Sequence, residues 1–164
     1  KLKEETYPNG EVKERCNYAY DEENTLSTLK IGEWSSFYEN GQLKSAGNYN
    51  IGTYIQCCTL GPCKQFYNYK SGTWKYYHSN GQLRATGEYE IKQLHVDTNC
   101  EGGDDLLFGL TSPQWQYFNE QGETVQSSEE LILELETVKT GGNTMADYFY
   151  PNPSKERIEM EFGE

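Results

Sequence analysis

Five cysteines are the side chains of this sequence best suited to covalent chemistry. Cys57, Cys58 and Cys63 lie close together, whereas Cys16 and Cys100 are distant in sequence. The three neighbouring cysteines lack the C-x₂-C pairs of structural zinc sites, so we do not expect a metal there. Disulfides persist in oxidising compartments, and an odd number of cysteines leaves at least one thiol unpaired or bonded outside the chain.

The two histidines are the other candidates for catalysis or metal binding. His78 falls on the buried face of a repeat described below, where a core histidine is expected. His95 lies near three aspartates, Asp97, Asp104 and Asp105, but without the spacing of metal ligands, so a solvated loop is favoured. The sequence contains no G-x-S-x-G, H-E-x-x-H or P-loop pattern. We therefore expect no enzyme, no catalytic residue, no cofactor and no metal.

A repeat of 20 residues organises the chain around these groups. Segments 32–51 and 72–91 share Gly, Trp, Asn-Gly, Leu, Gly and Tyr in register, and segment 52–71 is a degenerate copy with Tyr54 in place of the Trp. Aromatic residues lead up to each Gly-containing turn, a pattern typical of a β-hairpin. A short fixed period predicts stacked units that bury a shared face.

Turn chemistry predicts the pairing within each hairpin. A type I′ turn centred on Asn40-Gly41 would place Trp34 opposite Gly47, and Trp74 would likewise lie over Gly87. We expect turns at Asn9-Gly10, Asn40-Gly41, Leu60-Gly61, Asn80-Gly81 and near Gln121-Gly122, and a buried face that carries Trp34, Trp74 and Trp115.

The opposite face of the same hairpins is expected to be wet. It would carry Phe37 opposite Lys44 and Tyr77 opposite Arg84, where cation–π contacts are weak because they are exposed. These four residues form a candidate interaction face.

The same pairing, shifted by one repeat, predicts a disulfide. Cys58 and Cys63 would then lie directly opposite each other with Cα atoms ~4.5 Å apart, within the range that a disulfide tolerates. Cys57 would point to the other face and not compete.

The motif G-x-W-x-x-[FY]-x-x-N-G-x-L-[KR]-x-x-G-x-Y, which residues 32–91 carry, resembles the MORN-repeat variant of bacterial antitoxin-like proteins of the YwqK type. The resemblance implies an all-β fold, a meandering antiparallel sheet of successive hairpins. It brings no catalytic residue with it.

The repeat domain is expected to span residues 1–139, with irregular insertions at 19–31 and 92–112. The acidic triplet 21–23 could bind a cation, but a solvated loop is favoured because Ca²⁺ loops keep regular ligand spacing. Residues 140–164 would form a linker and a tail.

Residues 123–139 fit two kinds of element. Ser127-x-x-Glu130 is a capping box that would begin a helix, and Gly141-Gly142 would end it. Leu131, Leu133 and Leu135, however, alternate with more polar residues. We favour a strand because it continues the meander.

The last segment carries a second resemblance. Tyr150-Pro-Asn-Pro153, followed by Ile158, Met160 and Phe162 in alternation, resembles the start of the sorting domain of type IX secretion substrates in Bacteroidetes. It implies a secreted or cell-surface protein whose native chain extends in both directions. The alternative is an ordinary Pro-rich turn before a strand.

The composition restricts the partners of the chain. Its 164 residues carry a formal net charge of −12, which disfavours nucleic acid. No stretch has the ~18 apolar residues of a membrane span. We expect a non-catalytic secreted or cell-surface repeat module that binds a protein or glycan. The alternative is a cytoplasmic antitoxin or immunity protein that neutralises a basic toxin.

Overall fold

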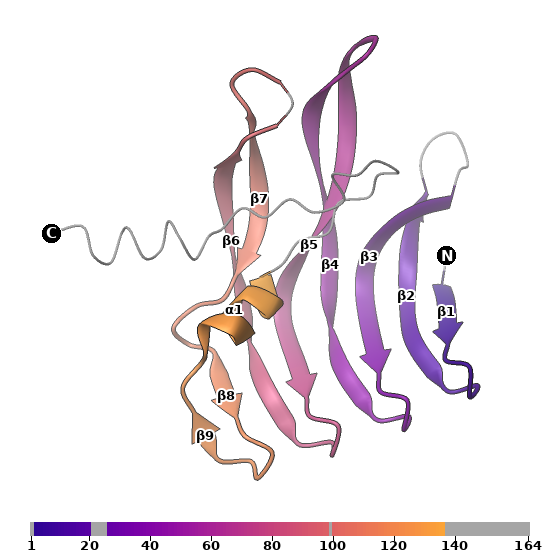
Figure 1. Ribbon diagram of the computed structural model, residues 1–164, viewed down its shortest axis with the longest axis vertical. Helices are drawn as coiled ribbons and strands as arrows, with labels where there is room; N and C mark the ends of the chain where they lie inside the picture. Colours follow the sequence, from indigo (N-terminus) through magenta and orange to yellow (C-terminus); the bar gives the residue numbers. More distant parts are fainter. Residues whose placement is uncertain (1, 21–25, 99, 137–164) are drawn as a thin grey trace, which may run out of the picture.

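The computed structural model describes residues 2–20, 26–98 and 100–136, and strands dominate them. Figure 1 shows the strands side by side from β1 to β9, with one short helix in front of the sheet. The elements are β1 (Leu2–Thr6), β2 (Val12–Tyr20), β3 (Leu26–Phe37), β4 (Leu43–Cys58), β5 (Gly61–Tyr77), β6 (Leu83–Val96), β7 (Asp104–Leu110), β8 (Gln116–Phe118), β9 (Thr124–Val125) and α1 (Glu129–Glu136).

The sheet is an antiparallel meander, which confirms the predicted all-β fold. Its strand order is β1-β2-β3-β4-β5-β6-β8-β9, and β7 pairs with β6 outside this path. The long strands each serve two hairpins: residues 43–49 of β4 pair with β3, whereas residues 50–58 pair with β5 alone. The hairpin turns therefore alternate between two ends of the sheet, and the β4–β5 hairpin projects furthest at one end (Figure 1).

A second ladder covers part of this projecting hairpin. The first half of β6 pairs with β5 and β8, and its second half pairs with β7. Between the β6–β7 hairpin and the β4–β5 hairpin lies one core cluster, made of Tyr54, Tyr67, Tyr69, Val96, Leu106, Phe108 and Leu110. The hydroxyl of Tyr67 accepts a hydrogen bond from the Leu107 amide at 2.6 Å, so the two hairpins are joined by a polar contact as well.

The Asn-Gly turns differ from the predicted two-residue type I′ turns. The Gly41 amide donates to the Tyr38 carbonyl at 2.9 Å, and the Tyr38 amide donates to the Gln42 carbonyl at 2.8 Å. Glu39 and Asn40 are therefore the central residues, and Gly41 follows them with a φ of +78°. This is the three-residue connection with a glycine bulge. A further irregularity between Ser36 and Phe37 restores the predicted pairing of Trp34 with Gly47.

The turn asparagines are explained by contacts between hairpins. The Asn40 side-chain amide donates to the Ser79 carbonyl at 2.9 Å, and its Oδ1 accepts from the Gln42 amide at 3.1 Å. Asn9 and Asn80 donate in the same way to the next turn at this end of the sheet. Each asparagine thus stabilises its own turn and links it to its neighbour.

Tryptophan packing defines the second core cluster, which contains Trp74, Tyr76, Ala85, Tyr89, Trp115, Tyr117 and Leu135. Trp74 and Trp115 are 0% and 5% exposed, as predicted, but Trp34 is only half-buried. We expected Trp34 to cover Gly47 and Trp74 to cover Gly87, but each of these glycines is covered by the tryptophan of the next hairpin. A Cβ at Gly47 would overlap the Trp74 ring, and one at Gly87 would overlap the Trp115 ring. Each ring therefore leans over the strand of the preceding hairpin.

The predicted strand over residues 123–139 is wrong, because β9 is short and α1 follows it. Ser128 begins the helix by accepting a hydrogen bond from the Leu131 amide at 3.2 Å. Leu131 and Leu135 pack on the aromatic cluster, and Tyr89 donates to the Leu135 carbonyl at 2.7 Å. The four-residue spacing of these two leucines fits one helix face. The tail 140–164 lies outside the described residues.

Candidate functional site

Two disulfides stabilise the end of the projecting hairpin. Cys58 and Cys63 are bonded, with their Cα atoms 5.9 Å apart. This is the pair expected from the sequence, but the pairing on which we based it is wrong. Cys58 pairs with Gly61, and Cys63 with Gln56, so the two cysteines are diagonal neighbours rather than directly opposed. The shift of two residues leaves both on the same face, because side chains alternate with a period of two.

The second disulfide joins Cys57 to Cys100, with Cα atoms 4.9 Å apart. Cys57 points to the opposite face from Cys58, as the alternation requires. The partner comes from the loop between β6 and β7, and Asp104 of the same hairpin accepts a hydrogen bond from the Ile55 amide at 2.7 Å. Sequence reasoning left the partner of Cys57 open, since nothing in the repeat showed that the β6–β7 hairpin folds across β4.

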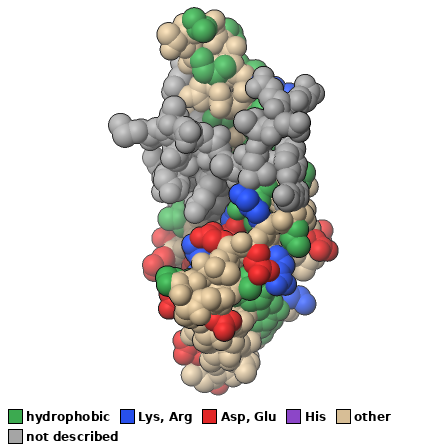
Figure 2. Space-filling model, turned by 90° about the vertical axis from the view of Figure 1, so that its right-hand side faces the viewer, with side chains coloured by type: hydrophobic (Ala, Val, Ile, Leu, Met, Phe, Trp, Pro, Cys, Tyr) green, Lys and Arg blue, Asp and Glu red, His purple; other side chains and the backbone are tan. Residues whose placement is uncertain are grey.

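The projecting hairpin exposes apolar side chains. Leu60 is 101% exposed at its tip, and Ile55 and Phe66 are 44% and 42% exposed on one face of the two strands. Pro62 is exposed beside them, and Lys64 lies over the Phe66 ring at 5.4 Å from its centroid. We call Ile55, Leu60, Pro62, Lys64 and Phe66 the tip patch. Figure 2 shows the projecting end with hydrophobic groups on its surface and no acidic side chain in this view.

The pairs of the predicted interaction face do not face each other. The irregularity near each turn pairs Phe37 with Leu43 and Tyr77 with Leu83. Lys44 instead lies over the Tyr38 ring, at 5.5 Å. Arg84 turns to α1 and forms a bidentate contact with Glu134, at 3.1 and 2.9 Å. Two of the four residues are thus engaged with groups that the sequence pairing did not anticipate.

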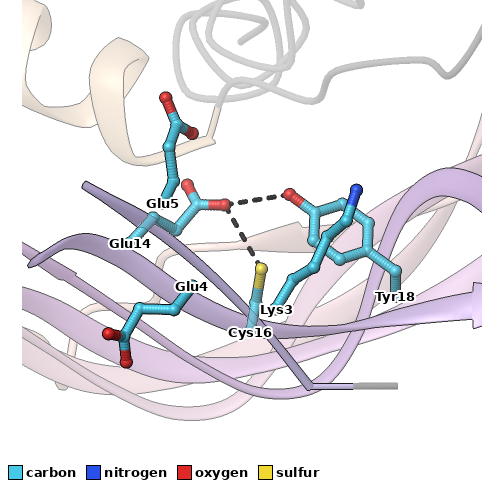
Figure 3. Close-up of a pocket in the computed structure, with 6 residues that line it drawn as sticks. All are labelled: Lys3, Glu4, Glu5, Glu14, Cys16 and Tyr18. Carbon is cyan, nitrogen blue, oxygen red and sulfur yellow. Dashed lines mark hydrogen bonds between the residues drawn. The ribbon is translucent and has the colours of Figure 1, made fainter. Parts of the chain in front are cut away.

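The remaining cysteine, Cys16, is buried beside a pocket of about 300 Å³ at the β1–β2 edge. Figure 3 shows Cys16 and Tyr18 both directed at Glu14, whose Oε1 accepts a hydrogen bond from each at 3.3 Å. Lys30 binds the other carboxylate oxygen of Glu14 at 2.6 Å. Burial alone would raise the pKa of Glu14, but Lys30 outweighs it and holds that pKa below its ordinary value. Burial, together with Glu14, raises the pKa of the Cys16 thiol, which is therefore a poor nucleophile.

A replaced tryptophan accounts for this pocket. Lys3 pairs with Cys16 as Trp34 pairs with Gly47, so Lys3 occupies the tryptophan position of the first hairpin. Its ammonium group lies over the Tyr18 ring at 5.2 Å instead of filling the core. Cys16 pairs with Trp34 and stands where the later hairpins have a glycine beneath the tryptophan ring. The Trp34 indole N–H has no acceptor of normal geometry among the described residues. The pocket is thus the irregular end of the repeat array.

The histidines and nearby acids have structural contacts. His78 Nε2 is 2.9 Å from the Phe118 carbonyl, and His95 Nδ1 is 2.8 Å from Asp105 Oδ1 on the exposed side of the β6–β7 hairpin. Among residues 2–20, 26–98 and 100–136, no group of three or more His, Cys, Asp or Glu side chains could hold a metal ion. The acidic triplet 21–23 lies outside this part of the chain.

Comparison with known families supports the repeat interpretation. Residues 30–50 and 70–90 each match the family model described as MORN repeat variant. Two segments of the chain are thus similar to MORN repeats. The two matched segments begin at Lys30 and Lys70, and each contains the tryptophan, the Asn-Gly turn and the tyrosine of the motif. The matched segments coincide with the β3–β4 and β5–β6 hairpins of the sheet.

No curated protein and no solved structure matches the chain. In the part of the chain that the structure describes, no helix has the length and apolar character needed to cross a membrane.

Proposed function

We propose that this chain is a non-catalytic interaction module that binds a protein or glycan outside the reducing cytoplasm, as a secreted or cell-surface protein. MORN repeats generally mediate interactions with proteins or membranes. The observation that carries the proposal is the use of four cysteines in two disulfides on a MORN-repeat scaffold. Such bonds persist in oxidising compartments and are rare in the cytosol.

The architecture supports a role in binding rather than in catalysis. The polar groups best suited to proton transfer are used to fix the fold, with His78 on a backbone carbonyl and Glu136 accepting from the Thr111 amide and hydroxyl at 2.7 and 2.6 Å. The open sheet presents broad faces on which a partner can lie, as the chain's own helix does. Function therefore depends on surface chemistry rather than on an active-site pocket.

The sorting-tail resemblance of residues 150–162 is a second, independent support for export. A cytoplasmic antitoxin that neutralises a basic toxin is the alternative function, favoured by the net charge of −12, which would steer a basic partner. The two proposals differ in compartment and in the redox state of the cysteines.

Localisation with thiol trapping tests the proposal. The full-length gene, with an internal epitope, is expressed in its native host, and cells are separated from culture medium before alkylation with a mass-tagged maleimide. We expect the protein outside the cytoplasm. Within the 164 residues described here, peptide mapping should show Cys16 alkylated after denaturation and the other four cysteines alkylated only after reduction. Protein found only in the cytosol with all five of these cysteines reduced would contradict export and favour the antitoxin alternative.

A further inference from the structure

The projecting hairpin lies within a segment of the chain that has no acidic residue. Residues 40–87 contain no Asp or Glu and five Lys or Arg residues. The remaining residues carry nine basic and 26 acidic side chains, a formal charge of −17. Lys64 is the one charged residue of the tip patch, and two acidic residues of the β6–β7 hairpin, Glu101 and Asp104, lie on the side of Ile55. Beyond a distance of ~8 Å, salt screens most of the repulsion between an acidic partner and the acidic remainder of the protein.

The tip patch is held in one conformation while it is exposed to solvent. Cys58–Cys63 closes the hairpin end, and Cys57–Cys100 and the Ile55–Asp104 hydrogen bond attach it to the β6–β7 hairpin. A fully exposed leucine contributes nothing to the folded core. Rigid apolar groups lose little conformational entropy on binding, which is a property of binding surfaces.

The shape of the patch suits a helix. Ile55 and Phe66 lie on one face of two adjacent strands. Because strands in a sheet are ~4.8 Å apart, two of them form a strip about 10 Å wide, which matches the ~10 Å diameter of a single helix. Lys64 projects from the same face and has no ion pair with a carboxylate among the residues that the structure describes. Such a face is complementary to a helix with an apolar stripe and flanking carboxylates.

The chain itself contains an example of this recognition. Helix α1, with the sequence EELILELE, places Leu131 and Leu135 on the aromatic cluster of the sheet. Its Glu134 forms the bidentate contact with Arg84. The sheet therefore already binds one acidic amphipathic helix through an apolar stripe and a basic residue on a strand.

We propose that the tip patch binds an acidic amphipathic helix of a partner protein. The inference rests on the proposed function and assigns its binding surface. Leu60, Ile55 and Phe66 contact the apolar stripe, and Lys64 pairs with a carboxylate at its margin. Glu101, exposed in the β6–β7 loop next to the Cys57–Cys100 disulfide, repels carboxylates at the other margin and so sets the orientation of the helix.

A membrane is the less suitable occupant. The segment from Ile55 to Phe66 contains no Trp or Tyr, the residues that anchor proteins at the membrane interface.

Fluorescence anisotropy with designed peptides tests the proposal on the oxidised 164-residue chain. The first probe is a labelled helical peptide with leucines along one face and glutamates beside them, and the second has lysines in place of the glutamates. We expect the acidic peptide to bind at least tenfold more tightly than the basic one. Leu60→Asp, and Lys64→Glu separately, should weaken its binding at least tenfold.

The control is Ile31→Asp, because Ile31 is 39% exposed on β3, outside the projecting hairpin. It should bind the acidic peptide like the parent chain, and circular dichroism should show all three variants folded. Equal binding of both peptides, no binding of the acidic one, or equal loss in the Ile31 control would overturn the inference. Co-sedimentation with vesicles of phosphatidylcholine and phosphatidylserine that depends on Leu60 would overturn it in favour of a membrane. If the chain is exported with both disulfides but any of these results is obtained, only the inference fails and the proposed function stands.

Discussion

The ammonium group of Lys70 lies 2.6 Å from the carbonyl oxygen of Leu135, in the last turn of α1. The same group lies over three aromatic rings, with distances of 5.3, 5.5 and 5.7 Å to the centroids of Trp74, Tyr76 and Tyr89. The C-terminal end of a helix carries partial negative charge, so a cation there is stabilising. Lys70 thus connects the helix to the aromatic face of the sheet.

Replacing Lys70 with Met should loosen α1. A hydrogen bond from a charged donor contributes about 1.5–3 kcal/mol, so we expect a loss of about 2 kcal/mol in the free energy of unfolding, measured with urea. Lys75→Met is the control, because Lys75 is exposed on the same strand. The role assigned to Lys70 would be wrong if both variants unfolded at the same urea concentration.

The three tryptophans should contribute unequally to stability. Trp74→Ala should cost about 3–5 kcal/mol, the range for large buried aromatic residues. Trp34→Ala should cost less than half as much, since Trp34 is half-buried and its indole N–H lacks a well-placed acceptor. Chemical denaturation of both variants checks this order. Equal losses would show that the first hairpins are packed as tightly as the later ones.

The two disulfides should differ in their effect on stability. Cys57 and Cys100 are 43 residues apart, whereas Cys58 and Cys63 are 5 residues apart. The chain-entropy relation then gives about 4 kcal/mol for the first bond and about 2 kcal/mol for the second. Double Cys→Ser variants of each pair, compared by thermal unfolding, should follow this order. A larger loss from the Cys58–Cys63 pair would contradict it.

Alkaline pH should destabilise the protein through its buried tyrosines. Burial raises the pKa of Tyr67 to about 12, with the Leu107 amide opposing this rise. An unfolded tyrosine ionises near pH ~10, so the unfolded state loses protons first and stability falls as pH rises from about 10 towards 12. Absorbance at the tyrosinate band should show a group of tyrosines that ionise only as the near-UV circular dichroism is lost. Complete ionisation with the fold intact would contradict the burial of these phenols.

The Cys16 thiol should be inert in the folded protein. It is 2% exposed and its pKa is raised by burial, so little thiolate forms near neutral pH. A thiol reagent such as dithionitrobenzoate should detect no thiol in the native oxidised chain and one after addition of guanidinium. Rapid reaction of one thiol under native conditions would mean that Cys16 is accessible or that a disulfide is open.

The repeat motif was sufficient to predict the antiparallel meander and the positions of the turns within the repeats, but not the pairing of β7 with β6 outside the main path. Trp, Gly and Tyr recur at positions that alternate with period two, so the buried face could be assigned even where the pairing was off by two residues. The turn type could not be predicted, because Asn-Gly suits both a type I′ turn and a longer connection. The contact from Asn40 to Ser79, which lies 39 residues further on, decides between them.

Contacts between distant segments were the part that the sequence did not predict. The Cys57–Cys100 bond depends on β6 leaving the main sheet, for which the repeat gives no signal. The alternation of Leu131, Leu133 and Leu135 suggested a strand, but Leu131 and Leu135 also share a helix face, and the aromatic surface stabilises the helix. The projecting tip patch was missed because the repeat alignment treated its leucine as a turn residue.

The asparagine contacts have a consequence for how such a protein can change in length. They tie each turn at one end of the sheet to the next, and the contacts of Asn40 and Asn80 span 39 and 40 residues. Removing or duplicating a whole unit of that size would leave the same donors facing the same acceptors. The turns at the other end are outside this arrangement, and there the chain places its disulfide-bonded tip and its glycine-rich loop. One end of the sheet is thus suited to the addition or loss of whole repeat units, and the other end is suited to insertions that could bind new partners.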